Sequence, residues 1–166
     1  MAITYKTQGK RSLFDEEFIV EKLSGIGNPL ETISKVIDFE MFRAPLESKL
    51  LNLDKKSNAG AKPFDVVLMF KILILQRYYG LGDKQIEYQI LDRISFKKFL
   101  CITSGDKVPD EKTVWLFREN VTKTGLVEEL FAQFKSYLES KELIFNEGQL
   151  VDASFTIAPR QRNTRE

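Results

Sequence analysis

The sequence predicts a mainly α-helical fold, a helical bundle with a helix-turn-helix-like segment, followed by one or two terminal β-strands. Apolar residues recur at three- and four-residue spacing between Phe14 and about Leu143, as on the buried face of a helix. Capping residues and glycines divide that region into short segments. From Val151 to Ile157, apolar and polar residues alternate instead, which is typical of a strand with one buried face.

The composition fits a globular chain and excludes several kinds of site. The 166 residues include 25 Lys and Arg against 24 Asp and Glu, one cysteine and no histidine. Without histidine, the chain cannot form a Ser-His-Asp or Cys-His nucleophile or a histidine-ligated zinc or haem site. The single cysteine, Cys101, leaves no internal disulfide, so we expect a reducing cytoplasmic location and a small, buried, apolar side chain at this position.

The first 61 residues are predicted to form two or three short helices and a linker. Asn28 is a suitable N-cap, with Pro29 at the first helical position and Glu31 placed to reach back to a free amide. Residues 52–62 are polar and rich in turn formers, so we interpret them as a solvated surface loop, with a flexible arm as the alternative.

A central helix follows, expected to open at Pro63 and to end at Gly80. It is apolar nearly all round, so other helices must cover most of it. Charged residues interrupt the run, which is also shorter than the roughly 20 residues needed to span a bilayer. With no charged segment and apolar run at the start of the chain, we expect neither a signal peptide nor contact with a membrane.

The next segments are predicted to wrap this helix. Asp83 is expected to cap a helix whose inner face carries Ile86 and Ile90, with Leu91 as a further candidate. A short turn from Ser95 then adds three more apolar side chains, namely Phe96, Phe99 and Leu100. The final helix of this region begins after Gly125 and carries five apolar residues at helical spacing, namely Val127, Leu130, Phe131, Phe134 and Leu138.

The segment from Asp83 to Lys123 resembles a helix-turn-helix unit, whose last helix would lie in the DNA major groove. That helix is expected to start after Asp110 and to bury Val114, Phe117 and Val121. Lys112, Glu119 and Lys123 then share the outer face, with Trp115 and Thr122 beside it. We expect Lys112 and Lys123 to contact phosphates and Trp115 to pack on a sugar or base. Arg118 lies near the edge of the core, where an internal ion pair and a DNA contact are equal alternatives. For the whole segment, an ordinary helical bundle and a helix-turn-helix unit are also equal alternatives.

The carboxyl-terminal residues offer one carboxylate and a basic tail. Asp152 lies on the polar side of the predicted strand, and Arg160 and Arg162 follow it as candidate DNA contacts. Two-metal phosphoryl transfer needs several carboxylates around a pair of cations, so Asp152 alone cannot build such a site. Judged from the pattern alone, an aspartate in a strand is far more often a solvated residue than a metal ligand.

Three stretches together resemble one family of proteins. They are KPFDVVLMFKILILQRYYGLGDKQIEYQILDRISFKKFL at 62–100, VPDEKTVWLFRENV at 108–121 and GQLVDASFTIAPR at 148–160. In this order and spacing they resemble the N-terminal part of bacterial insertion-sequence transposases of the InsH type, the insertion-sequence-five group of the DDE superfamily. The stretches cover well over half of the chain.

The resemblance implies three parts: N-terminal helices and a linker at 1–61, a helical DNA-binding and assembly region at 62–143, and the start of an RNase H-like catalytic domain with a basic tail at 144–166. It also implies that Asp152 is the first catalytic carboxylate and a Mg²⁺ ligand. Such transposases use Mg²⁺ to cut at terminal inverted repeats and to join the freed ends to target DNA. The family's second Asp and final Glu have no counterpart here, so we expect a truncated protein with an orphaned metal ligand and no cofactor or DNA cleavage of its own.

Three hypotheses follow for the function. The first is the N-terminal fragment of an insertion-sequence transposase that binds double-stranded DNA at element ends, and that forms a homo-oligomer or associates with full-length transposase. The second is one part of a frameshifted or split DDE transposase that becomes active with its remainder. The third is a non-enzymatic helical oligomerisation or inhibitory module, which predicts association without DNA affinity.

Overall fold

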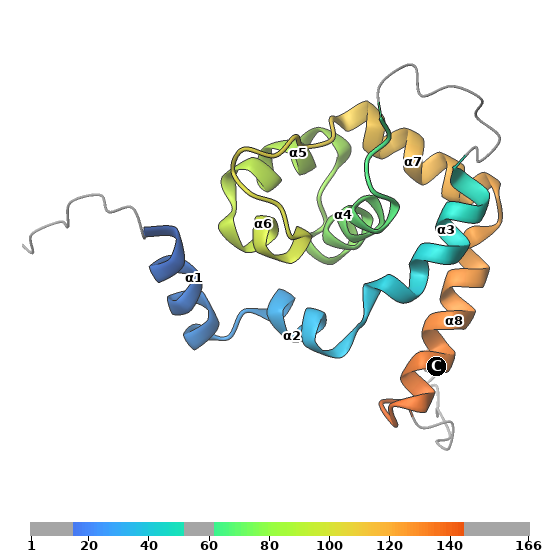
Figure 1. The fold of residues 1–166 in the computed structure, drawn as a ribbon, viewed down its shortest axis with the longest axis horizontal. Helices are drawn as coiled ribbons and strands as arrows, with labels where there is room; N and C mark the ends of the chain where they lie inside the picture. The colour runs from blue at the N-terminus through green and yellow to red at the C-terminus, as the bar shows by residue number, and fades with distance from the viewer. Residues whose placement is uncertain (1–14, 52–61, 145–166) are drawn as a thin grey trace, which may run out of the picture. The chain divides into compact units, whose positions relative to one another are not determined.

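The computed structural model describes residues 15–51 and 62–144, and every regular element among them is a helix (Figure 1). The chain divides into two compact units, Met1–Phe131 and Ala132–Glu166. The helices of residues 15–51 and 62–144 confirm the predicted mainly α-helical class. The predicted strand Val151–Ile157 and the predicted linker at 52–61 lie outside the described residues, and the predicted domain boundaries at 61/62 and 143/144 stay predictions.

Three α-helices and one 3₁₀ helix make up residues 15–50. They are α1 (Asp15–Ile26), α2 (Pro29–Val36), a 3₁₀ helix η1 (Phe39–Phe42) and α3 (Arg43–Leu50). The Asn28 side chain accepts a hydrogen bond from the Leu30 amide at 3.1 Å, which confirms the predicted cap of α2. Glu31 does not bind the free amide predicted for it: its carboxylate accepts a 2.6 Å hydrogen bond from the Ser24 hydroxyl, which joins α2 to α1, and pairs with Lys35 at 3.1 Å.

Helix α4 (Val66–Tyr79) is the centre of the first unit, in contact with η1, α3, α5, α6 and α7. It begins three residues after the predicted start at Pro63, because Asp65 caps it by accepting hydrogen bonds from the Val67 and Leu68 amides at 2.9 and 3.0 Å. Its end at Gly80 is confirmed: this residue has φ 63° and ψ 35°, a left-handed conformation that favours glycine. The apolar residues on α4 that face its neighbours are buried, namely Val66, Val67, Met69, Ile72 and Leu75.

Helices α5 (Asp83–Asp92) and α6 (Ile94–Leu100) pack against α4, as predicted (Figure 1). Their inner side chains are buried, namely Ile86, Ile90, Phe96, Phe99 and Leu100. Leu91 is instead 51% exposed, so it does not belong to the inner face. The prediction for Cys101 was also wrong: its side chain is exposed, and the residue ends α6 with φ 58°, a position set by the backbone.

A charged side chain joins three of these elements. The Lys71 ammonium of α4 lies 5.2 Å from the ring centre of Phe39 in η1 and 5.4 Å from that of Phe99 in α6. It also donates a 3.2 Å hydrogen bond to the Phe99 carbonyl, near the carboxyl end of α6, where the helix dipole favours a cation. Lys71 therefore fits between apolar neighbours on α4 because aromatic faces and a carbonyl surround its charge.

Helices α7 (Glu111–Lys123) and α8 (Leu126–Ser140) complete the described chain. Gly125 separates them with φ 66°, which confirms the predicted break. In α8, Leu126 and Leu130 are buried, whereas Val127 and Phe131 are 48% and 67% exposed. No helix in the ranges 15–51 and 62–144 is both long and apolar enough to cross a bilayer.

Candidate nucleic-acid interface

Helix α7 has the two faces that the sequence predicts. The Asp110 side chain caps it by accepting a 2.8 Å hydrogen bond from the Thr113 amide. Val114 and Val121 are 0% and 5% exposed and face the helices of the first unit, while Phe117 is half-buried beside them. The buried stripe fixes which side of α7 faces solvent.

The solvent side of α7 exposes the residues predicted to contact DNA. Lys112 and Lys123 are exposed, and Trp115 between them is 48% exposed. The Lys123 ammonium lies 3.6 Å from the Glu119 carboxylate one turn earlier, with 70% of the lysine side chain in solvent. An exposed pair of this kind contributes little and is easily exchanged for another anion. The face therefore combines two accessible cations with an accessible aromatic ring.

Arg118 forms the internal ion pair that was one of its two predicted alternatives. Its two terminal nitrogens donate hydrogen bonds of 2.8 and 2.6 Å to the two carboxylate oxygens of Asp83 in α5. Asp83 also accepts a 2.9 Å bond from the Gln76 amide of α4, which is 7% exposed. The hydrogen bonds from Arg118 lower the pKa of Asp83 against the raising effect of burial, so this carboxylate is ionised at neutral pH.

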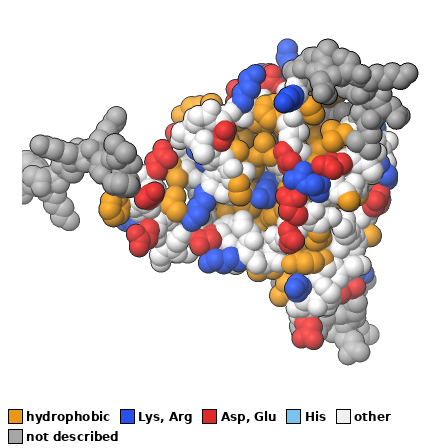
Figure 2. All heavy atoms as spheres, in the orientation of Figure 1, with side chains coloured by type: hydrophobic (Ala, Val, Ile, Leu, Met, Phe, Trp, Pro, Cys, Tyr) orange, Lys and Arg blue, Asp and Glu red, His pale blue; other side chains and the backbone are white. Residues whose placement is uncertain are grey.

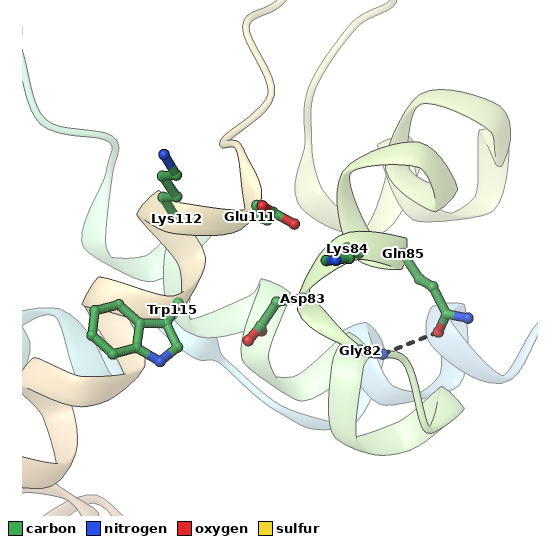
Figure 3. A pocket seen from close by; sticks show the side chains of 7 residues that line it. All are labelled: Gly82, Asp83, Lys84, Gln85, Glu111, Lys112 and Trp115. Carbon is green, nitrogen blue, oxygen red and sulfur yellow. Dashed lines mark hydrogen bonds between the residues drawn. The ribbon is translucent and has the colours of Figure 1, made fainter.

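An open hollow of about 570 Å³ lies where the first turns of α5 and α7 meet (Figure 3). Lys84 and Gln85 line it from α5, and Glu111, Lys112 and Trp115 line it from α7. The Gly82 amide donates a 3.1 Å hydrogen bond to the Gln85 side chain and closes the start of α5. Lys84 therefore lines the same hollow as Lys112 and Trp115, two of the residues predicted to contact DNA. The sequence did not single out Lys84.

The family known as the transposase domain, DUF772, matches residues 18–120, from α1 to the last turn of α7. The chain belongs to this family. The match includes α4, α5 and α6 and most of the solvent face of α7, so the hollow of Figure 3 lies within the transposase domain. No solved structure matches the chain.

The helices of this transposase domain are connected differently from the predicted helix-turn-helix unit over Asp83–Lys123. Residues 101–110 separate α6 from α7, a longer connection than the three- or four-residue turn of that motif. The single residue Arg93 joins α5 to α6, and the three-residue turn Gly80-Leu81-Gly82 joins α4 to α5. Its left-handed Gly80 allows the sharp change of direction that brings the first turn of α5 beside α7.

Three predicted site residues of the transposase chain lie outside the described part, namely Asp152, Arg160 and Arg162. Their roles as metal ligand and DNA contacts stay predictions. Within residues 15–51 and 62–144, no group of three or more His, Cys, Asp or Glu side chains is placed to hold a metal ion. The described part thus offers a surface for binding and no carboxylate cluster for Mg²⁺.

Asp83 is not the N-cap of α5 that the sequence predicts. Gly82 is the N-cap of α5, and Asp83 uses its carboxylate on Arg118 and Gln76. One signal was available: Gln85 lies three residues after Gly82, where a glutamine side chain commonly accepts from the N-cap amide. The ion pair between Asp83 and Arg118 joins residues thirty-five positions apart, so local spacing could not predict it.

Proposed function

We propose that this transposase domain binds double-stranded DNA at the terminal inverted repeats of an InsH-type insertion sequence, through the solvent face of α7. The observation that carries the proposal is the exposed Trp115 between the exposed cations Lys112 and Lys123. Membership of a transposase family supports DNA as the partner. The role of Asp152 in Mg²⁺ chemistry belongs to this proposal as an expectation for a complete enzyme.

The chemistry of the face suits a phosphate backbone. Lysine ammonium groups form salt-dependent contacts with phosphates, which position a protein on a duplex. An exposed indole offers a flat surface that packs on a sugar or stacks on a base. Because Val114 and Val121 are anchored in the core, these side chains project from a helix whose orientation is fixed.

The charge distribution supports a mode of DNA binding that depends on a few contacts. The sequence has a net charge of +1, and the face in Figure 2 shows acidic and basic side chains interspersed among hydrophobic ones. A general basic field of the kind that attracts DNA at long range is therefore not available. Binding should depend on discrete lysines, and neutralising one of them should have a measurable effect.

Charge-removing variants of the two lysines test the proposal. We expect Lys112→Gln and Lys123→Gln each to weaken binding to a labelled duplex and to reduce the slope of log K against log salt by about 1. Lys35→Gln is the matched control, because Lys35 on α2 is also exposed, at 73%, and also pairs with a glutamate four residues away, at 3.1 Å. This variant should bind as the wild type does.

Specificity is tested with the terminal repeats of the element that carries the gene, against a shuffled duplex of equal length. Tighter binding to the repeats supports the proposal. Absence of binding at low salt, or equal effects of the Lys112, Lys123 and Lys35 variants, would contradict it.

Self-association is a second candidate function, favoured by one observation on α8. Val127 and Phe131 lie one turn apart and are 48% and 67% exposed, which places two large apolar side chains together in solvent. A second copy of this chain is the proposed occupant. Sedimentation velocity should then show a concentration-dependent dimer that Phe131→Ser weakens, while a strictly monomeric wild type would exclude this function.

A further inference from the structure

The strongest polar contact between α5 and α7 lies directly beside the hollow. Arg118 of α7 holds both carboxylate oxygens of Asp83 at 2.8 and 2.6 Å, and the buried Gln76 of α4 fixes one of the same oxygens at 2.9 Å. The Gln76 oxygen in turn lies 3.5 Å from an Arg118 nitrogen. Three helices thus share one polar contact, and Asp83 is its centre.

This contact joins the two helices that carry the lysines of the hollow. Asp83 is the first residue of α5 and precedes Lys84, which lines the hollow from that side. Arg118 lies on the same helix as Lys112 and Trp115, which line it from the other side (Figure 3). Moving the first turn of α5 away from α7 would therefore separate Lys84 from Lys112.

We propose that Arg118 is a positioning residue of the DNA-binding surface: its grip on Asp83 holds α5 against α7, so that Lys84 and Lys112 contact the duplex together. The inference rests on the proposed function and extends it to α5. It gives Lys84 a phosphate contact and gives Arg118 a role that does not involve touching DNA.

The hydrogen bonds of Arg118 argue against a two-point phosphate contact through its terminal nitrogens. Both terminal nitrogens of the guanidinium already bind one carboxylate, in the two-point geometry that arginine forms with carboxylates and phosphates alike. A DNA phosphate that took the same two N–H donors would have to replace Asp83, and that would break the contact between the helices. Asp83 keeps its charge at neutral pH, so the competition persists under binding conditions.

The direction in which Asp83→Asn changes DNA affinity separates the two roles of Arg118. If Arg118 were a phosphate ligand, Asp83→Asn would remove a negative charge near DNA and release Arg118, so binding should tighten. If Arg118 positions α5, the same substitution weakens the bidentate pair and binding should fall. We expect Asp83→Asn to bind roughly fivefold more weakly than the wild type, the equivalent of the coupling of about 1 kcal/mol expected for this partly exposed pair.

Two further variants complete the experiment, with the full chain and a labelled mixed-sequence duplex about three helical turns long. Arg118→Lys keeps the cation but cannot bind both carboxylate oxygens, so Lys84 should lose its phosphate contact, and we expect weaker binding with a salt slope lowered by about 1. Lys84→Gln should lower the salt slope by about 1, and Lys35→Gln should leave both quantities unchanged. Circular dichroism at the binding temperature establishes that each variant is folded.

The inference is overturned if Asp83→Asn binds DNA more tightly, if Arg118→Lys binds as the wild type does, or if Lys84→Gln leaves the salt slope unchanged. Should Asp83→Asn fail to fold, the affinity and slope of Arg118→Lys decide between the two roles. These outcomes differ from failure of the proposed function, in which the wild-type chain itself shows no salt-dependent binding to the duplex.

Discussion

Replacing Cys101 by glycine should stabilise the protein. Cys101 ends α6 with φ 58° and ψ 37°, and its amide bonds to the carbonyls of the preceding turn. A residue with a Cβ pays about 1–2 kcal/mol for this left-handed conformation. Glycine avoids that cost but loses about 0.4–1 kcal/mol more conformational freedom on folding. Because the thiol is exposed, little packing is lost, and the net gain is about 0.5–1 kcal/mol.

The assay is thermal and urea unfolding followed by circular dichroism. For a chain of this size, a gain of about 0.5–1 kcal/mol should raise Tm by roughly 1–4 °C. Cys101→Ala separates loss of the thiol from relief of the backbone, and should unfold within about 0.5 kcal/mol of the wild type.

A reciprocal change is available at the end of α4. Gly80 has φ 63°, and a Cβ built there meets nothing within 4 Å, so Gly80→Ala adds backbone strain without a clash. It should cost about 0.5–1 kcal/mol. The reasoning is refuted if Cys101→Gly is no more stable than Cys101→Ala, or if Gly80→Ala costs nothing.

Three other changes test the contacts that position the interface. A double-mutant cycle of Asp83→Asn and Arg118→Met should give a coupling of about 1 kcal/mol in urea unfolding, since both side chains are partly exposed, at 28% and 40%. The hydrogen bonds from Arg118 are the chief cause that lowers the pKa of Asp83 in the folded protein. The ion pair therefore stabilises the fold fully at pH values above 3.8, the ordinary pKa of an aspartate, and this stabilisation is lost as the pH falls through the lowered pKa. The urea midpoints of wild type and Asp83→Asn should therefore converge in acid, and parallel pH profiles would contradict the assignment. Asp65→Ala should cost about 1–2 kcal/mol by removing the cap of α4, and unchanged unfolding would show that the cap is dispensable. Ile72→Ala should cost about 2–5 kcal/mol at a fully buried position, against less than about 1 kcal/mol for Leu91→Ala at a half-exposed one, and equal costs would refute the assigned core.

Local signals predicted the helices well. The caps at Asn28 and Asp110 and the glycine ends at Gly80 and Gly125 all stand in the structure where the sequence places them. Each cap or helix end depends on the types of a few consecutive residues, so it can be predicted from the sequence. The start of α4 was placed three residues early because Pro63 is a good first helical residue, whereas the Asp65 side chain, with two amides to bind, decides the boundary.

Contacts between distant residues were harder to foresee. The faces of α7 followed from helical spacing, so the exposure of Lys112, Trp115 and Lys123 was predictable. The partner of Arg118 was not, because nothing in the spacing of α7 identifies Asp83, thirty-five residues away. Lys84 was missed for the same reason: its neighbours in the hollow belong to another helix.

Fluorescence of the single tryptophan tests the central claim most directly. Trp115 is the only tryptophan among the 166 residues, and it is 48% exposed on the proposed face. Titration with duplex DNA should quench or shift its emission in step with binding, and the affinity should fall as salt rises from about 50 to 200 mM. Unchanged emission while a labelled duplex reports binding would place the DNA elsewhere on the protein and contradict the account.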